Sequence, residues 1–255
     1  MRYSVEVYPE ESPARRERLM QTLASYAEAY PIAWASVTCS KRRLGPVPTI
    51  ELARDIQRNF GWPTAPHLTG RGHGWADLKK TVALLKRSEL TSVVAIRGDG
   101  SAETGEPFPT GSHLVAGLRE IAPDLNISAA CYPERHPESQ DDRDDLAALR
   151  AKTAAGARDL ITQFVLQPGI LTSFMQKLRG SGIQTPVIAG VLVPTETERI
   201  NRLAERCGVR RCERYDDSTF QTLCAEAEQA GYAGVHLFTL NQPLNPMKGA
   251  LHASL

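Results

Sequence analysis

Residues 131–138 of this chain, Cys-Tyr-Pro-Glu-Arg-His-Pro-Glu, gather an aromatic ring, an imidazole and two carboxylates within eight positions. The stretch follows a short apolar run, residues 126–130, and precedes an acidic segment, residues 141–145, that is typical of a helix start. Two prolines restrict its backbone, and the residues before them, Tyr132 and His136, are disfavoured from the helical region. A strand is therefore expected to end here in a stiff loop, either a polar connector or one wall of a binding site.

Glu6 is a second candidate for chemistry, because it stands between two valines in a short apolar segment near the N-terminus. In a strand of a closed sheet, Glu6 would point into the interior, where an unpaired charge is costly unless it binds a proton or finds a partner. A carboxyl group in such a place is a candidate proton donor near neutral pH.

The elements that must position these residues alternate in type along the chain. Eight β-rich segments are expected, at residues 3–8, 32–38, 65–69, 92–96, 126–131, 160–164, 186–192 and 234–239. Helical spacing of apolar residues is found between them, at residues 49–60, 75–86, 113–121, 146–155, 171–179, 196–207 and 218–230. This alternation predicts parallel strands with right-handed crossovers, and eight units predict a single (β/α)8 barrel domain over residues 1–255. A doubly wound open sheet is the alternative, but no Gly-x-Gly-x-x-Gly follows the first strand.

In such a barrel the carboxyl ends of the strands build the active site. Polar or ionisable residues are expected at nearly every one of these ends: Glu6, Thr38, His67, Arg97 with Gly98 and Asp99, Tyr132 with His136, Gln163, and His236 with Thr239 and Asn241. Strand seven supplies Gly190 instead. The loop of residues 98–111, with four glycines and two prolines, is expected to be a mobile cover over the barrel mouth.

Composition excludes several classes of partner. The net charge is +1, from 30 basic and 29 acidic residues, which argues against nucleic acid or an anionic membrane as the main partner. No apolar run approaches the roughly 18–20 residues of a membrane helix, and because a strand-like segment begins at residue 3, no signal peptide is expected. The five cysteines show no Cys-x-x-Cys spacing, so neither a disulfide framework nor a structural metal site is expected, and the cytoplasm is the expected compartment.

Several of these motifs, in order along the chain, resemble those of the methylenetetrahydrofolate reductases. They are Ser-Val-Glu-Val-Tyr-Pro at residues 4–9, His-Leu-Thr at 67–69, Arg-Gly-Asp at 97–99, Tyr-Pro-Glu-Arg-His-Pro-Glu at 132–138, Gly-Ala at 156–157 leading into Ile-Thr-Gln-Phe at 161–164, and Gly-Val-His-Leu-Phe-Thr-Leu-Asn at 234–241. The matches extend from residue 4 to residue 241. The family is an eight-stranded barrel, in agreement with the strand count.

The resemblance implies an enzyme in which FAD takes hydride from NADH or NADPH and passes it, in a ping-pong cycle, to 5,10-methylenetetrahydrofolate. Glu6 would protonate the folate, Asp99 would lie between flavin and pterin, and Gln163 would bind folate and nicotinamide in turn. Substrate contacts would also come from Leu203 and Phe238. The FAD contacts implied by the matching motifs are Thr38, His67, Arg97, Gly98, Asp99, Tyr132, His136, Asp145 and Lys152. Asp145 and Lys152 are seven residues apart and should share one helix face, where a solvated surface is the competing interpretation. The two loop glutamates, Glu134 and Glu138, are expected to cap or pair within their loop.

Departures from the family pattern gather on the substrate side. Leu203 replaces an aromatic residue that packs on the nicotinamide, Phe238 stands where a tyrosine is usual, and Gln242 where a basic residue is expected. The segment of residues 208–218 is shorter than in the family. Three consecutive basic residues, Lys41, Arg42 and Arg43, follow the second strand. They are expected either to bind phosphate or the glutamate tail of the folate, or to form a solvated loop. Three alternatives therefore stay open beside the self-sufficient reductase. One is an FAD-binding subunit that takes electrons from a partner protein, and another is a divergent paralogue acting on another folate or pterin. The third is a flavin-free variant with direct hydride transfer, against which the intact FAD positions argue. The chain could also form a homo-oligomer.

Overall fold

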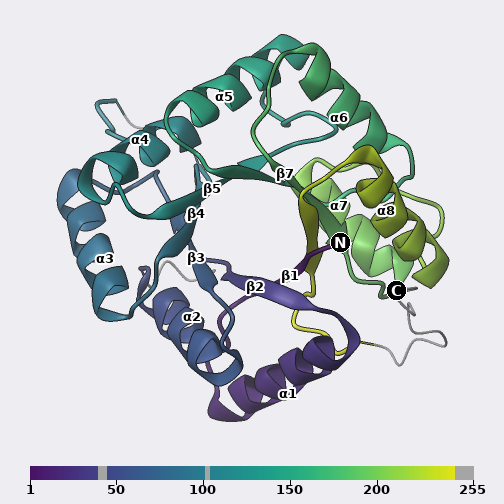
Figure 1. Ribbon diagram of the computed structural model, residues 1–255, viewed down its shortest axis with the longest axis horizontal. Helices are drawn as coiled ribbons and strands as arrows, with labels where there is room; N and C mark the ends of the chain where they lie inside the picture. The colour runs from purple at the N-terminus through teal and green to yellow at the C-terminus, as the bar shows by residue number, and fades with distance from the viewer. Residues whose placement is uncertain (40–44, 101–103, 245–255) are drawn as a thin grey trace.

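The computed structural model describes residues 1–39, 45–100 and 104–244. Its strands form one closed parallel barrel in the order β1 to β8, with β8 pairing to β1 (Figure 1). The strands are β1 (Tyr3–Val7), β2 (Ile32–Val37), β3 (Thr64–Thr69), β4 (Ser92–Ile96), β5 (Asn126–Cys131), β6 (Asp159–Thr162), β7 (Val187–Leu192) and β8 (Gly234–Phe238). The predicted (β/α)8 barrel is confirmed, and the strand bounds differ from the expected ones by at most two residues.

Helices surround the barrel (Figure 1). They are α1 (Pro13–Ala29), α2 (Val47–Phe60), α3 (Trp75–Arg87), α4 (Gly111–Ile121), α5 (Asp142–Ala154), α6 (Ile170–Gly180), α7 (Thr197–Cys207) and α8 (Asp217–Ala230). Helix α1 was not among the expected helices, because its first turns are dominated by charged residues. Its buried positions, Leu19, Leu23 and Tyr26, nevertheless have helical spacing, so the signal was present.

Two helices, α7 and α8, lie between β7 and β8, whereas the described residues of each other connection between successive strands contain one helix. Helix α8 packs against β7, β8 and α6, and so takes the place of the crossover helix. Helix α7 instead ends beside the β5 loop: a Cβ on Gly208 would overlap the ring of Pro137. Arg210, just beyond α7, forms an ion pair with Glu134 of the same loop. The end of α7 therefore lies on the side of the barrel where the strands end.

The interior of the barrel is divided into an apolar and a polar part. Ala65, Val94, Ile161 and Ile188, from β3, β4, β6 and β7, form a small apolar cluster that is separate from the larger core between strands and helices. On the β8, β1, β2 and β3 side the interior is lined by polar side chains instead. They are Ser4, Glu6, Ser36, His67 and His236.

Among the described residues, no helix is long and apolar enough to cross a lipid bilayer. All five cysteines lie within the described ranges and are free thiols.

Candidate functional site

Glu6 points into the barrel, as its position in β1 predicted, and lies between two imidazoles. Its Oε2 is 3.4 Å from Nε2 of His67 and 3.7 Å from Nε2 of His236. The Glu6 side chain is 15% exposed, whereas His236 is completely buried. The carboxyl group is thus shielded from bulk water on the inner side but remains accessible from the barrel mouth.

His67 has a buried Nε2 that makes no aligned hydrogen bond within the described structure, although Glu6 is close enough for electrostatic attraction. Burial lowers the pKa of His67, the negative charge of Glu6 acts in the opposite direction, and His236 adds to the lowering. A neutral His67 with an unsatisfied ring nitrogen is well suited to bind a polar atom of a ligand.

Thr38 and Asp99 approach the same mouth from β2 and β4. The Thr38 amide donates to the Val7 carbonyl beside Glu6, while Asp99 is exposed. The neighbouring thiol of Cys39 is influenced by both carboxylates: burial raises its pKa to about 12, and the charges of Asp99 and Glu6 add to this effect. Glu6 and Asp99 are therefore both within electrostatic reach of this thiol.

Arg97, at the end of β4, forms a bidentate ion pair with Glu138 in the β5 loop. This contact raises the pKa of Arg97 and lowers that of Glu138, chiefly through their hydrogen bond. The expectation that Glu134 and Glu138 pair within their own loop is wrong. Both reach out of it, Glu138 to Arg97 at the end of β4 and Glu134 to Arg210 beyond α7, because the closed barrel brings these distant segments close to the loop.

The β5 loop holds Tyr132 and His136 edge to face, with ring centroids 4.6 Å apart. The loop is anchored to α5, since Asp145 accepts hydrogen bonds from the His136 amide and from the Ser139 hydroxyl. Burial is the main cause that lowers the pKa of His136, and the nearby charge of Arg97 adds to it.

Lys152 lies on the same face of α5 as Asp145, and its ammonium group donates to the Ala130 carbonyl at 2.7 Å. Burial lowers the pKa of Lys152, so the interpretation of this face as a solvated surface is wrong. The side chain also passes the start of α4: a Cβ on Gly111 would lie 3.3 Å from Lys152 Cε and 3.9 Å from the Arg97 amide nitrogen. Because a helix N-terminus favours anions, this corner has the chemistry of a phosphate site.

The expected substrate residues lie on the other side of the mouth. Gln163 follows β6 and accepts a hydrogen bond from the Phe164 amide. The ring of Phe238 contacts the rings of Phe164 and His236 edge to face. Gly190 packs closely against Phe238: a Cβ at position 190 would lie only 2.7 Å from Phe238 Cε2, so glycine leaves room for the ring. Leu203, on α7, is partly buried against the core.

Some of the sequence expectations fall outside the described residues. Lys41, Arg42 and Arg43 do so, as do residues 101–103 of the glycine-rich loop. In the described part of this loop Phe108 is buried and contacts Trp75, with ring centroids 5.0 Å apart.

Sequence reasoning placed His236 at a strand end but gave it no role in the site, and it missed Ser4 and Ser36 altogether. Inside the barrel, each serine hydroxyl contacts one ring nitrogen of His236. The alternation of inward and outward residues along β1, β2 and β8 could have identified them.

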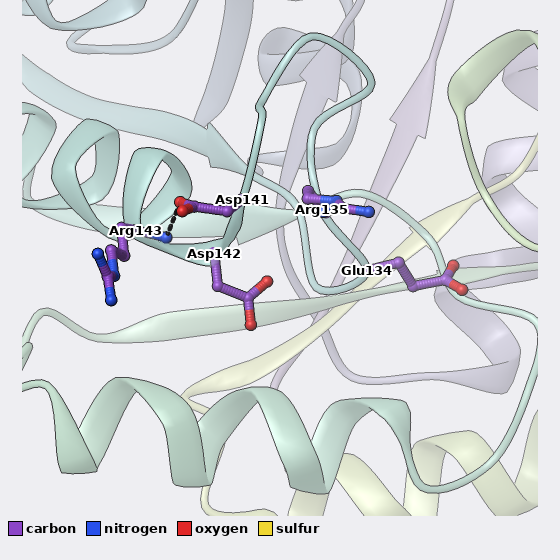
Figure 2. Close-up of a pocket in the computed structure, with 5 residues that line it drawn as sticks. All are labelled: Glu134, Arg135, Asp141, Asp142 and Arg143. Carbon is purple, nitrogen blue, oxygen red and sulfur yellow. Dashed lines mark hydrogen bonds between the residues drawn. The ribbon is translucent and has the colours of Figure 1, made fainter.

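A surface hollow of 480 Å³ lies apart from Glu6, at the outer edge of the β5 loop and the start of α5 (Figure 2). It is open and lined by charged side chains only, Glu134, Arg135, Asp141, Asp142 and Arg143. Asp141 caps α5 through the amides of Arg143 and Asp144, so its role is accounted for by the helix start.

The residues at the barrel mouth fit the FAD implied by the motifs. Two of the five N–H donors of Arg97 bind Glu138, which leaves donors for a phosphate. Lys152 and the start of α4 supply positive charge beside Arg97, and His67 offers an unsatisfied ring nitrogen. Among the described residues no three His, Cys, Asp or Glu side chains are grouped so that they could hold a metal ion.

Comparison with solved structures agrees with the fold. An uncharacterised protein from Clostridium thermocellum that binds two copies of 5-methyl-5,6,7,8-tetrahydrofolic acid superposes with a TM-score of 0.64 at 12% identity, covering 93% of this chain and 88% of that one. A phosphoenolpyruvate phosphomutase from Streptomyces platensis subsp. rosaceus gives a TM-score of 0.57 at 16% identity, covering 92% and 75%. At such identities the likeness concerns the barrel fold alone.

Comparison of sequences is more specific. The 5,10-methylenetetrahydrofolate reductase of Pectobacterium carotovorum subsp. carotovorum is 29% identical over 207 residues, 81% of this chain and 69% of that protein. The enzyme of the same name from Escherichia coli K12 is 32% identical over 162 residues, 64% of this chain and 54% of that protein. The family model for methylenetetrahydrofolate reductase matches residues 1–215, which include β1 to β7 and the polar residues at the ends of these strands, but not β8. This chain therefore belongs to the methylenetetrahydrofolate reductase family.

Proposed function

We propose that this chain reduces 5,10-methylenetetrahydrofolate to 5-methyltetrahydrofolate, using NADH or NADPH as the hydride donor and FAD as the carrier in a ping-pong cycle. The observation that carries the proposal is the place of Glu6, inside the mouth of a barrel of this family and in contact with His67 and His236. We further propose that the catalytic unit is this one barrel, residues 1–255, acting in the cytoplasm.

Glu6 is the proton donor of the proposed reaction. Reduction of the methylene group adds one hydride to carbon, and opening the five-membered ring of the folate requires one proton on nitrogen. Glu6 is suited to give this proton, because its carboxyl group is largely shielded from water yet reaches the mouth. Bound FAD would supply the two-electron chemistry that links nicotinamide to folate.

The other residues bind and orient the cofactor and the substrates. Arg97 and Lys152, with the start of α4, are suited to hold the cofactor phosphates, and Thr38, His67, Gly98, Tyr132 and His136 to contact the rest of the cofactor. Asp145 acts through the His136 amide, which it holds in place. On the substrate side Asp99 would hold the pterin, and Gln163, Leu203 and Phe238 would line the shared folate and nicotinamide pocket.

Anaerobic half-reactions test the proposal. The purified protein is expected to be yellow, to bleach when NADH or NADPH is added, and to regain its colour when methylenetetrahydrofolate follows. A colourless protein that still reduces the folate would contradict the role of FAD.

Glu6→Gln separates the two half-reactions. The amide has the size of the carboxyl group but cannot give a proton, so we expect bleaching by nicotinamide to persist while the folate half-reaction falls by about 10²- to 10⁴-fold. Unchanged folate turnover in this variant would refute the acid role of Glu6.

A second candidate function is an FAD-binding subunit that receives electrons from a partner protein. It is favoured by Leu203, an aliphatic residue that offers no aromatic face to a nicotinamide ring. The same anaerobic titration distinguishes it, because the protein would then stay yellow with NADH and NADPH and bleach only after the partner is added.

A further inference from the structure

His236 lies at the centre of the polar half of the barrel, with a serine hydroxyl at each ring nitrogen. Its Nδ1 is 2.7 Å from Ser4 Oγ and its Nε2 is 3.0 Å from Ser36 Oγ. Trp34 stacks on the ring at a centroid distance of 4.8 Å and an angle of 9°, so the imidazole is fixed in its plane. His236 and Ser36 are completely buried, and Ser4 is almost completely so.

Counting protons in this group selects one tautomer. Ser4 Oγ also donates to the Val235 carbonyl, at 3.3 Å, whereas Ser36 Oγ has only His236 Nε2 as a partner in the described structure. Each hydroxyl has one proton to donate, and a neutral imidazole has one. If Ser36 donates to Nε2, then Nδ1–H donates to Ser4, and Ser4 donates to the Val235 carbonyl, so that every donor has an acceptor.

The other arrangements leave a buried donor unpaired. With the ring proton on Nε2, or with both nitrogens protonated, the Nε2–H would point at Ser36 Oγ. The hydroxyl proton of Ser36 would then lack an acceptor among the described residues. Leaving a buried hydroxyl donor unpaired is costly, so the hydrogen-bond pattern favours the neutral Nδ1–H form.

This tautomer decides what Glu6 faces. Nε2 of His236, which lies 3.7 Å from Glu6 Oε2, carries a lone pair and no proton. The ring therefore cannot pair with the carboxylate as an imidazolium. The other titratable groups in electrostatic reach of the ring are His67 and Asp159. Burial lowers the pKa of His67 and raises that of Asp159, so both are shifted towards their neutral forms.

We infer that Ser4, Ser36 and His236 are positioning residues for Glu6: the two serines hold His236 as the Nδ1–H tautomer, so that its unprotonated nitrogen faces the carboxyl group that transfers the proton. The catalytic part of this inference rests on the proposed function, whereas the tautomer does not.

Nitrogen NMR of the protein labelled with ¹⁵N-histidine tests the tautomer without any turnover. The His236 signals are assigned by their loss in His236→Gln. We expect a protonated Nδ1 and an unprotonated Nε2 at neutral pH. A signal pattern of the Nε2–H tautomer or of an imidazolium would overturn the inference.

Ser36→Ala tests the consequence for catalysis. Without the hydroxyl, the ring is free to place its proton on Nε2 and donate to Glu6, so we expect the NMR pattern to change. The folate half-reaction should slow by about tenfold, as for one lost hydrogen bond, while bleaching by nicotinamide stays as in the wild type. Ser25→Ala, which removes a hydroxyl on α1 outside the barrel, is the matched control and should change neither readout.

The outcomes distinguish a failure of the positioning role from a failure of the proposed function. An active wild type whose folate half-reaction is unaffected by Ser36→Ala overturns the positioning role, and so does an equal loss in both half-reactions. A wild type that binds FAD but never reduces the folate contradicts the proposed function instead, while the NMR result still decides the tautomer.

Discussion

Replacing Lys152 with methionine should weaken FAD binding while leaving the fold of the apoprotein intact. The lysine is held by one described hydrogen bond, to the Ala130 carbonyl at 2.7 Å, and burial lowers its pKa. Methionine keeps the length and apolar character of the side chain but removes the charge. The variant therefore isolates the electrostatic part of the proposed phosphate site.

The expected changes in FAD affinity and in apoprotein stability follow from what surrounds Lys152 with and without the cofactor. A hydrogen bond from a charged donor to a phosphate contributes about 1.5–3 kcal/mol, so the dissociation constant of FAD should rise by about 10- to 150-fold. In the apoprotein, loss of the bond to Ala130 is offset by removal of a desolvated ammonium group, so the free energy of unfolding should change by no more than about 1 kcal/mol.

The lowered pKa of Lys152 predicts how the stability of the apoprotein changes with pH. The native pKa of Lys152 lies below its usual value of 10.5, so between these two values the unfolded chain binds more protons than the native one. The wild type should therefore gain stability relative to Lys152→Met as the pH rises through this window, with no further gain above it. Taking the difference between the two proteins cancels the opposite contribution of buried tyrosines such as Tyr26, whose pKa is raised by burial.

Titration of the apoproteins with FAD, followed by flavin fluorescence, measures the affinity, and urea unfolding at a series of pH values measures stability. Lys80→Met, which removes an exposed lysine on α3, is the control. The reasoning about the phosphate site is refuted if Lys152→Met binds FAD as tightly as the wild type, or if Lys80→Met weakens binding equally.

Two further predictions concern the packing around the site. Gly190→Ala should destabilise the protein by about 1–3 kcal/mol, because its Cβ would overlap the Thr162 carbonyl oxygen in β6; an unchanged urea midpoint would contradict this. Tyr215→Phe should cost about 1–3 kcal/mol, since the buried Tyr215 hydroxyl donates to the Leu192 carbonyl at 2.7 Å and the substitution removes this hydrogen bond. Thermal unfolding measures this loss, and a melting temperature equal to that of the wild type would contradict the prediction.

Sequence alone was sufficient for the barrel and for the residues at its mouth. The apolar periods of 2 and 3.6 are local properties, so the alternation of strands and helices is visible without any tertiary information. Because parallel strands of a barrel all end on one side, the positions of Glu6, His67 and Tyr132 at strand ends placed them in one region. The motif resemblance then supplied a family, which the match over residues 1–215 bears out.

Only the tertiary structure decided which of these groups touch. Glu6 and His236 are 230 positions apart in the sequence, yet closure of β8 against β1 brings them within 3.7 Å. Likewise Glu138 pairs with Arg97 rather than within its own loop. Such contacts depend on the register between strands and on how far each side chain reaches, and neither is encoded in local periodicity. The sequence thus determined which chemical groups stand at the mouth of the barrel, and the closed sheet determined how they are paired.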